Sequence, residues 1–185
     1  MEEDQNYLKV RKIILFFLSF LFSINSFANE IKISKIVDLE DPWGSSFIND
    51  KEIIITEKFG KIKLVNIETK KISNIKHNIN FLVDGQGGLL DIIYKDPHIW
   101  ISYSEDRGSG KSNTSIVRGK LNKKNIDFKN IFQASPSINS GYHFGSRLAI
   151  KDNYIFASIG ERGGGMIAQD PTNHTGSIIR IYLDG

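Results

Sequence analysis

The sequence predicts an antiparallel all-β protein built from repeated hairpins, on two observations. Beyond Ala28, short apolar or alternating runs rich in Ile, Val, Phe and Tyr lie between turn residues, and helical periodicity is almost absent. The hairpins recur at intervals of about 30 to 45 residues, which is typical of four-stranded propeller blades. The same spacing also allows a β-sandwich.

Four hairpins are expected, each made of two β-rich runs on either side of a short turn. In chain order the paired runs are 52–58 with 61–68, 89–95 with 98–104, 115–121 with 126–132, and 147–151 with 154–160. A last run, 177–183, follows a glycine-rich loop and ends at Asp184-Gly185, a pair that normally introduces another strand. We therefore expect a chain that is truncated at its C-terminus.

The N-terminus has the pattern of an export signal. Three basic residues, Lys9, Arg11 and Lys12, precede an apolar run over 13–24, and Ser26-Phe27-Ala28 follows it. Basic, apolar and small-x-small segments in this order predict a secretory signal peptide over 1–28, cleaved after Ala28. Residues 29–185 would then form the mature domain, periplasmic or secreted and without stable membrane insertion. An uncleaved N-terminal anchor is the alternative.

Composition excludes several classes of protein. The 185-residue chain is 40% hydrophobic and 24% charged, as expected of one soluble globular domain. A formal charge of +3, spread along the chain, does not favour nucleic-acid binding, which needs a concentrated basic stripe. Absence of cysteine excludes disulfides and thiolate metal sites.

Four stretches, in order, resemble the soluble glucose/sorbosone or aldose sugar dehydrogenases that use pyrroloquinoline quinone (PQQ). They are DPWGSSFIND with the following KEIIITEKFGKIKLV (41–65), DGQGGLLDIIY (84–94), HFGSRLAI with YIFASIGERG (143–163), and AQDPTNHTGSIIRIYLDG (168–185). The resemblance implies a six-bladed β-propeller with PQQ on its axis. A closed ring needs on the order of 300 residues, so residues 29–185 would be an N-terminal part with about three blades.

His143 is the candidate catalytic base. A neutral imidazole can accept the hydroxyl proton of a sugar near neutral pH, and a loop leading directly into a strand would hold it rigidly. Taken alone, a lone loop histidine is more often structural. By resemblance, His143 matches the family's general base and lies against the cofactor.

Gln86, in DGQGGLL, is the second candidate site residue. Its amide can donate and accept hydrogen bonds at once, and the glycines beside it would let the backbone approach a flat cofactor closely. By resemblance, Gln86 faces PQQ and substrate. An exposed turn residue is the other interpretation.

Neighbouring motifs are assigned structural roles. Trp43 is expected to fill the wedge between blades, and Arg147 to form a structural ion pair. The stretch 161–165 lacks the Lys-Ser/Thr of a phosphate-binding loop, and we expect a flexible loop with at most a minor role in shaping the substrate site. His77, His98 and His174 have no metal-ligand spacing with one another, so no metal ligand is predicted.

The resemblance therefore predicts an oxidoreductase that oxidises the anomeric carbon of an aldose to a lactone, with hydride transfer to PQQ. The partners would be a small-molecule sugar and an electron acceptor that the sequence does not identify. Ca²⁺ would accompany PQQ, with ligands from the part of the fold beyond residue 185. Tyr142 stands where the glucose-oxidising branch has an acid, which favours the broader aldose branch. A secreted non-catalytic binding module, or an inactive fragment, is the alternative.

Overall fold

The computed structural model describes residues 7–14, 16 and 31–185, which fall in two compact units, Met1–Lys35 and Ile36–Gly185. Residues 7–14 of the first unit are helical. The expected signal peptide and its cleavage site after Ala28 lie mostly outside the described residues. None of the helices in the described part has the length and apolar character needed to cross a membrane.

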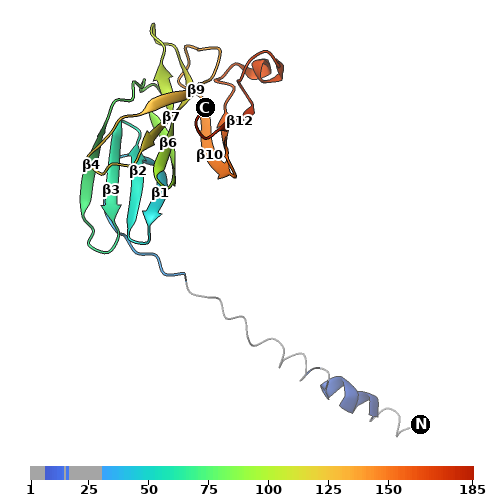
Figure 1. Ribbon diagram of the computed structural model, residues 1–185. Helices are drawn as coiled ribbons and strands as arrows, with labels where there is room; N and C mark the ends of the chain where they lie inside the picture. The colour runs from blue at the N-terminus through green and yellow to red at the C-terminus, as the bar shows by residue number, and fades with distance from the viewer. Residues whose placement is uncertain (1–6, 15, 17–30) are drawn as a thin grey trace. The chain divides into compact units, whose positions relative to one another are not determined.

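The second unit consists of three sheets that follow one another along the chain, which confirms the all-β prediction (Figure 1). The first sheet contains β1 (Pro42–Asn49), β2 (Glu52–Glu57), β3 (Lys61–Asn66), β4 (Ile72–His77) and the short β8 (Asn125–Ile126). The second contains β5 (Leu89–Lys95), β6 (His98–Asp106), β7 (Ser112–Lys120) and β9 (Lys129–Gln133). The third contains β10 (Gly145–Lys151), β11 (Tyr154–Ile159) and β12 (Ile178–Tyr182), with the 3₁₀ helix η1 (Gly165–Gln169) before β12.

Three of the four expected hairpins form as predicted: β2 pairs with β3, β5 with β6, and β10 with β11, all antiparallel. The last predicted run is β12, which pairs with β11. Turn chemistry explains the connections, as at Gly60, whose φ of +92° lies in the left-handed region that glycine adopts readily.

The predicted pairing of 115–121 with 126–132 is wrong at the start of the second run. Residues 129–133 do pair with β7, as β9, but Asn125–Ile126 pairs in parallel with β4 of the first sheet. Burial explains why this segment pairs with β4. Ile126 and Phe128 are only 1% and 5% exposed, and both belong to the core between the first two sheets. Alternation of apolar and polar residues predicts which side chains are buried, but not which sheet the strand joins.

Two apolar cores lie between the three sheets. Ile54, Leu64 and Ile101 belong to the core between the first and second sheets. Trp100 and Ile155 belong to the core between the second and third. The second sheet is therefore covered on both faces, which accounts for the nearly continuous burial along β6 and β7.

Neighbouring sheets are also joined by a buried hydroxyl, which we call a bridging hydroxyl. The first strands of successive sheets lie next to one another, β1 against β5 and β5 against β10. Thr56 on β2 accepts the N–H of Gly44 in its own sheet at 3.1 Å and donates to the carbonyl of Leu90 in the next sheet at 2.5 Å. One side chain thereby fixes the register of two sheets.

The second sheet repeats the bridging hydroxyl. Ser102 on β6 accepts the N–H of Asp91 at 3.0 Å and donates to the carbonyl of Ser146 on β10 at 2.6 Å. In the third sheet, Ser158 on β11 accepts the N–H of Arg147 at 3.0 Å. The three hydroxyls occupy the same place in their sheets, although only two of them have a following sheet among the described residues.

Trp43 does not fill a wedge between sheets, contrary to expectation, because it is 43% exposed. It directly precedes Gly44, just as Leu90 directly precedes Asp91. Leu90 is only 1% exposed. Trp43 occupies the matching position in the first sheet, and no sheet of the described residues covers that face.

Candidate active site

The two predicted site residues come together at one edge of the sheets. Gln86 lies three residues before β5, and His143 lies two residues before β10. The backbone N–H of His143 donates to Gln86 Oε1 at 2.9 Å. Residues 57 positions apart in the chain thus share one loop cluster.

Glycine allows the two loops to approach so closely. The N–H of Gln86 donates to the carbonyl of Gly141 at 2.7 Å. Gly85 has a φ of +51°, and a Cβ at this position would lie 2.5 Å from the Gly141 oxygen. A side chain at Gly85 would therefore separate the loops that carry Gln86 and His143.

The contact with His143 changes what Gln86 can do. Because Oε1 already accepts the His143 N–H, the amide cannot offer all of its groups to a ligand. No side-chain or backbone acceptor for the Nε2 amide is found among the described residues. Gln86 is exposed, so its chemical contribution is a pair of N–H donors beside the His143 ring.

The His143 ring pairs with a carboxylate that sequence reasoning did not single out. His143 Nδ1 contacts Glu161 Oε1, with the two side chains 54% and 26% exposed. When Nδ1–H donates to the carboxylate, Nε2 is the unprotonated nitrogen, free to accept a proton. The hydrogen bond from His143 lowers the pKa of Glu161 below its usual value, which keeps the carboxylate ionised as the partner of the ring.

The expectation of a flexible loop at 161–165 is therefore wrong at its first two residues. Glu161 contacts His143 and also accepts the N–H of Gly163 at 3.1 Å. Arg162 is 1% exposed. A signal was present in the sequence, because the start of β10 and the end of its antiparallel partner β11 lie at the same sheet edge.

Two other residues near His143 were considered. Arg147 Nη1 lies 3.4 Å from Asp91 Oδ1, so the structural ion pair expected for it is present. Tyr142 is 61% exposed, and its ring centroid is 6.2 Å from that of His143. An aromatic face thus stands beside the candidate base, where the glucose-oxidising branch was expected to have an acid.

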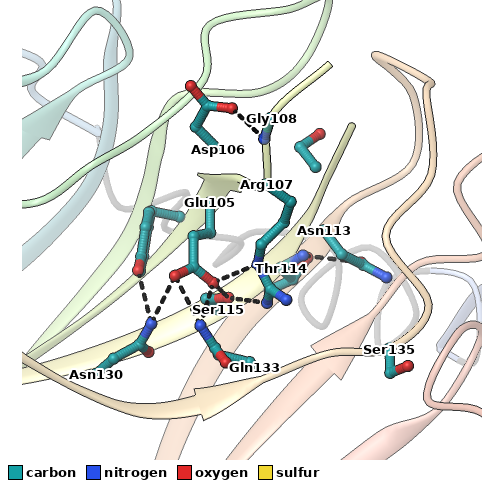
Figure 2. Close-up of polar contacts among 12 residues, drawn as sticks. Glu105, Asp106, Arg107, Gly108, Asn113, Thr114, Ser115, Asn130, Gln133 and Ser135 are labelled. Atoms are coloured by element: carbon teal, nitrogen blue, oxygen red, sulfur yellow. Dashed lines mark hydrogen bonds and ion pairs between the residues drawn. The ribbon is translucent and has the colours of Figure 1, made fainter. Parts of the chain in front are cut away.

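A separate polar cluster lies on β6, β7 and β9, centred on Glu105 (Figure 2). Its carboxylate accepts from Ser115 at 2.7 Å and Asn130 at 2.9 Å, and pairs with Arg107 at 2.6 Å. Gln133 Nε2 donates to both carboxylate oxygens. Because both oxygens of Glu105 are satisfied by protein donors, this cluster stabilises the second sheet and offers no free group for catalysis.

The other three histidines have structural contacts. His77 Nε2 lies 2.7 Å from the Gly60 carbonyl, and His174 Nδ1 accepts the N–H of Ser135 at 3.0 Å. His98 Nε2 lies 3.1 Å from Arg118 Nη2. In the described part of the chain, no three His, Cys, Asp or Glu side chains are grouped as metal ligands.

Comparisons with known proteins match most of this chain. The model of the Glucose / Sorbosone dehydrogenase family matches residues 39–185. Aldose sugar dehydrogenase YliI of Escherichia coli is 30% identical over 157 residues, which is 80% of this chain and 42% of that protein. A crystal structure of a glucose dehydrogenase superposes with a TM-score of 0.79 at 28% identity, covering 84% of this chain and 48% of the other.

The PQQ-bound aldose sugar dehydrogenase of Streptomyces coelicolor has a TM-score of 0.73 at 22% identity, a likeness that shows the fold. It covers 84% of this chain and 49% of the other. The chain thus spans less than half the length of each of these relatives. The family match over residues 39–185 leads to one conclusion: this chain belongs to the glucose/sorbosone dehydrogenase family.

Proposed function

We propose that this chain carries the proton-accepting side of the active site of a PQQ-dependent aldose dehydrogenase. The contact of His143 Nδ1 with Glu161 is the observation that carries the proposal. It leaves Nε2 to take the anomeric hydroxyl proton while the C1 hydride departs and a lactone forms. Glu161 stabilises the positive charge that the ring then acquires.

PQQ would supply the two-electron acceptor for the hydride. The exposed Gln86 N–H donors can hydrogen-bond a quinone carbonyl, so one side of the site fits. The nearby cations are engaged: Arg147 pairs with Asp91, and Lys58 Nζ donates to the Gly85 carbonyl at 2.5 Å. We therefore assign no described residue to the carboxylates of PQQ, and none to the Ca²⁺ proposed to accompany it.

We propose further that the three sheets are successive blades of a six-bladed β-propeller. The adjacent first strands β1, β5 and β10 would then line the axis, and the loops of Gln86 and His143 would open onto it. Repetition of the bridging hydroxyl at Thr56 and Ser102 supports this arrangement, since each sheet uses the same contact to position the next. Residues 29–185 would form this domain.

Binding of PQQ tests the proposed function. The full gene product is purified and titrated with PQQ, with and without Ca²⁺, and quinone absorbance is followed. Saturable binding that is weakened by Gln86→Ala is expected. With an aldose and an artificial electron acceptor, His143→Gln should lower turnover by about 10²-fold, the usual scale for loss of a general base. Absence of saturable PQQ binding would favour a non-catalytic binding module.

We also propose that the protein is exported, to the periplasm or beyond, with residues 1–28 removed. The basic, apolar and small-residue segments over 9–28 support this. N-terminal sequencing of the protein from the exported fraction should begin at Asn29. Recovery of the intact N-terminus from the membrane fraction would indicate an uncleaved anchor.

A further inference from the structure

Arg162 is a buried arginine, and none of the described carboxylates forms an ion pair with its guanidinium. Its Nε donates to the Tyr142 carbonyl at 2.9 Å and its Nη1 to the Ser112 carbonyl at 2.6 Å. Its Nη2 donates to the Ser140 carbonyl and, at 3.2 Å, to Ser112 Oγ. The plane of the guanidinium thus joins β7 to the loop just before His143.

The same guanidinium also holds the loop on the other side of His143. It stacks over the ring of Phe144, with Cζ 3.6 Å from the ring centroid. The backbone N–H of Arg162 donates to the carbonyl of His143 itself at 3.3 Å. Arg162 therefore contacts residues 140, 142, 143 and 144. One residue thus stabilises the loop before, at and after the candidate base.

The loop needs such support because His143 has an unfavourable backbone conformation. Its φ is +48°, in the left-handed region where a β-carbon crowds the following carbonyl oxygen. Residues held in this region persist only when surrounding contacts fix them, and such residues concentrate at functional sites. Arg162 contacts the carbonyls of Tyr142 and His143, and the Gln86 amide accepts the His143 N–H. The Phe144 carbonyl accepts the Gly160 N–H at 3.0 Å and the Thr114 hydroxyl at 2.7 Å.

Only an arginine can make this set of contacts. A guanidinium presents five donors in a rigid plane, whereas an ammonium is a compact, strongly hydrated point charge. Burial lowers the pKa of Arg162 to about 10, so the group is still protonated at neutral pH and all its donors are available.

We infer that Arg162 is a positioning residue for His143. It fixes the left-handed peptide, so that the imidazole meets Glu161 on one side and presents Nε2 to substrate on the other. This inference rests on the proposed role of His143 as the base. Arg162 itself, buried beneath the loop, touches neither sugar nor cofactor.

Amide hydrogen exchange at His143 tests the inference without relying on activity, because that N–H is the one donated to Gln86 Oε1. In Arg162→Met and Arg162→Lys, exchange at His143 should be at least about tenfold faster than in the unaltered protein, since local opening becomes easier. Methylguanidinium added to Arg162→Ala should restore the slow exchange. Arg147→Met is the matched control: its arginine is 72% exposed, and exchange at His143 should be unchanged.

Turnover gives the second measurement. Arg162→Lys should lower kcat by about tenfold to a hundredfold with little change in KM, the scale expected when a catalytic group is misplaced by about 1 Å. If Arg162→Met does not fold, Arg162→Lys is measured in the same way. Unchanged exchange at His143 in Arg162→Lys would overturn the inference, whereas unchanged turnover in His143→Gln would overturn the proposed function alone.

Discussion

At the scale of single residues, the site is organised around the His143–Glu161 pair. The carboxylate contacts Nδ1, and when Nδ1–H donates to it, Nε2 is the unprotonated nitrogen of the ring. Neither residue is deeply buried, with side chains 54% and 26% exposed. The geometry therefore depends on the contacts of the loops rather than on burial of the pair.

Replacing Glu161 by glutamine should weaken the base without removing it. The amide can still accept a hydrogen bond from Nδ1–H, but it no longer stabilises the ring when the ring becomes charged. We expect kcat to fall by about tenfold to a thousandfold, less than the loss in Glu161→Ala. Steady-state kinetics of both variants check this. Glu68→Gln, in an exposed ion pair with Lys51, is the matched control and should leave kcat unchanged.

The lowered pKa of Glu161 also predicts a pH dependence of stability. Because the folded-state pKa is depressed, the hydrogen bond stabilises the folded protein above the pKa of an unfolded glutamate. That contribution is lost as the pH falls through the folded-state value. Urea unfolding of the unaltered protein and Glu161→Gln should therefore differ at pH 7 and converge in acid. A difference that grows on acidification would contradict the assignment.

Gly85 provides a test of the close approach between the two site loops. Alanine here adds a Cβ that would lie 2.5 Å from the Gly141 oxygen, at a φ of +51°. We expect a loss of about 2 to 4 kcal/mol in the free energy of unfolding, from backbone strain together with the clash. Gly108→Ala is the control, since Gly108 has a φ of +78° with open space around it. A loss at Gly85 no larger than that at Gly108 would show that the loops do not meet as described.

At the scale of strands and loops, the sequence predicted the elements better than their partners. The hairpins at β2–β3, β5–β6 and β10–β11 followed from turn residues and alternation. The pairing of Asn125–Ile126 with β4 could not be predicted in this way, because Ile126 is buried only when the first and second sheets pack together. His143 and Gln86 were predicted from the family resemblance. Glu161 and Arg162 were not, because they lie in a glycine-rich stretch with the composition of a flexible loop.

The bridging hydroxyls should differ in their contribution to stability. Ser102→Ala leaves the Asp91 N–H and the Ser146 carbonyl without their buried partner, a loss of about 1 to 3 kcal/mol in the free energy of unfolding. Ser158→Ala removes a single contact, with the Arg147 N–H, at a half-buried position, and should lose less. Urea unfolding of the two variants side by side checks the order. Equal losses would show that the contact with the next sheet contributes nothing.

At the scale of the whole molecule, the first and third sheets each have one face that no other sheet of the described residues covers. Phe47 on β1 is 57% exposed, and Ile178 on β12 is 77% exposed. Both lie on the opposite side from the cores, which contain Ile54 and Ile155. Exposed apolar sheet faces of this kind favour association.

We therefore expect this chain to self-associate, and Phe47→Lys combined with Ile178→Lys to reduce that association. Light scattering over a range of concentrations measures the effect. Thr69→Lys with Gln169→Lys adds the same charge at two exposed positions, one in a turn and one at the end of η1, and should leave association nearly unchanged. Equal reduction by both pairs would mean that net charge, rather than the sheet faces, controls solubility.

The repeated hydroxyl has a consequence for how such proteins can change. Each sheet is registered to the next by one donor on its second strand and one carbonyl on the first strand of its neighbour. A carbonyl is present in every residue, so this hydrogen bond itself requires only a serine or threonine on the donor strand. A whole sheet could thus be duplicated, deleted or exchanged with that of a relative while this hydrogen bond is kept. The loops that carry the candidate site residues would then vary independently of the contact between sheets.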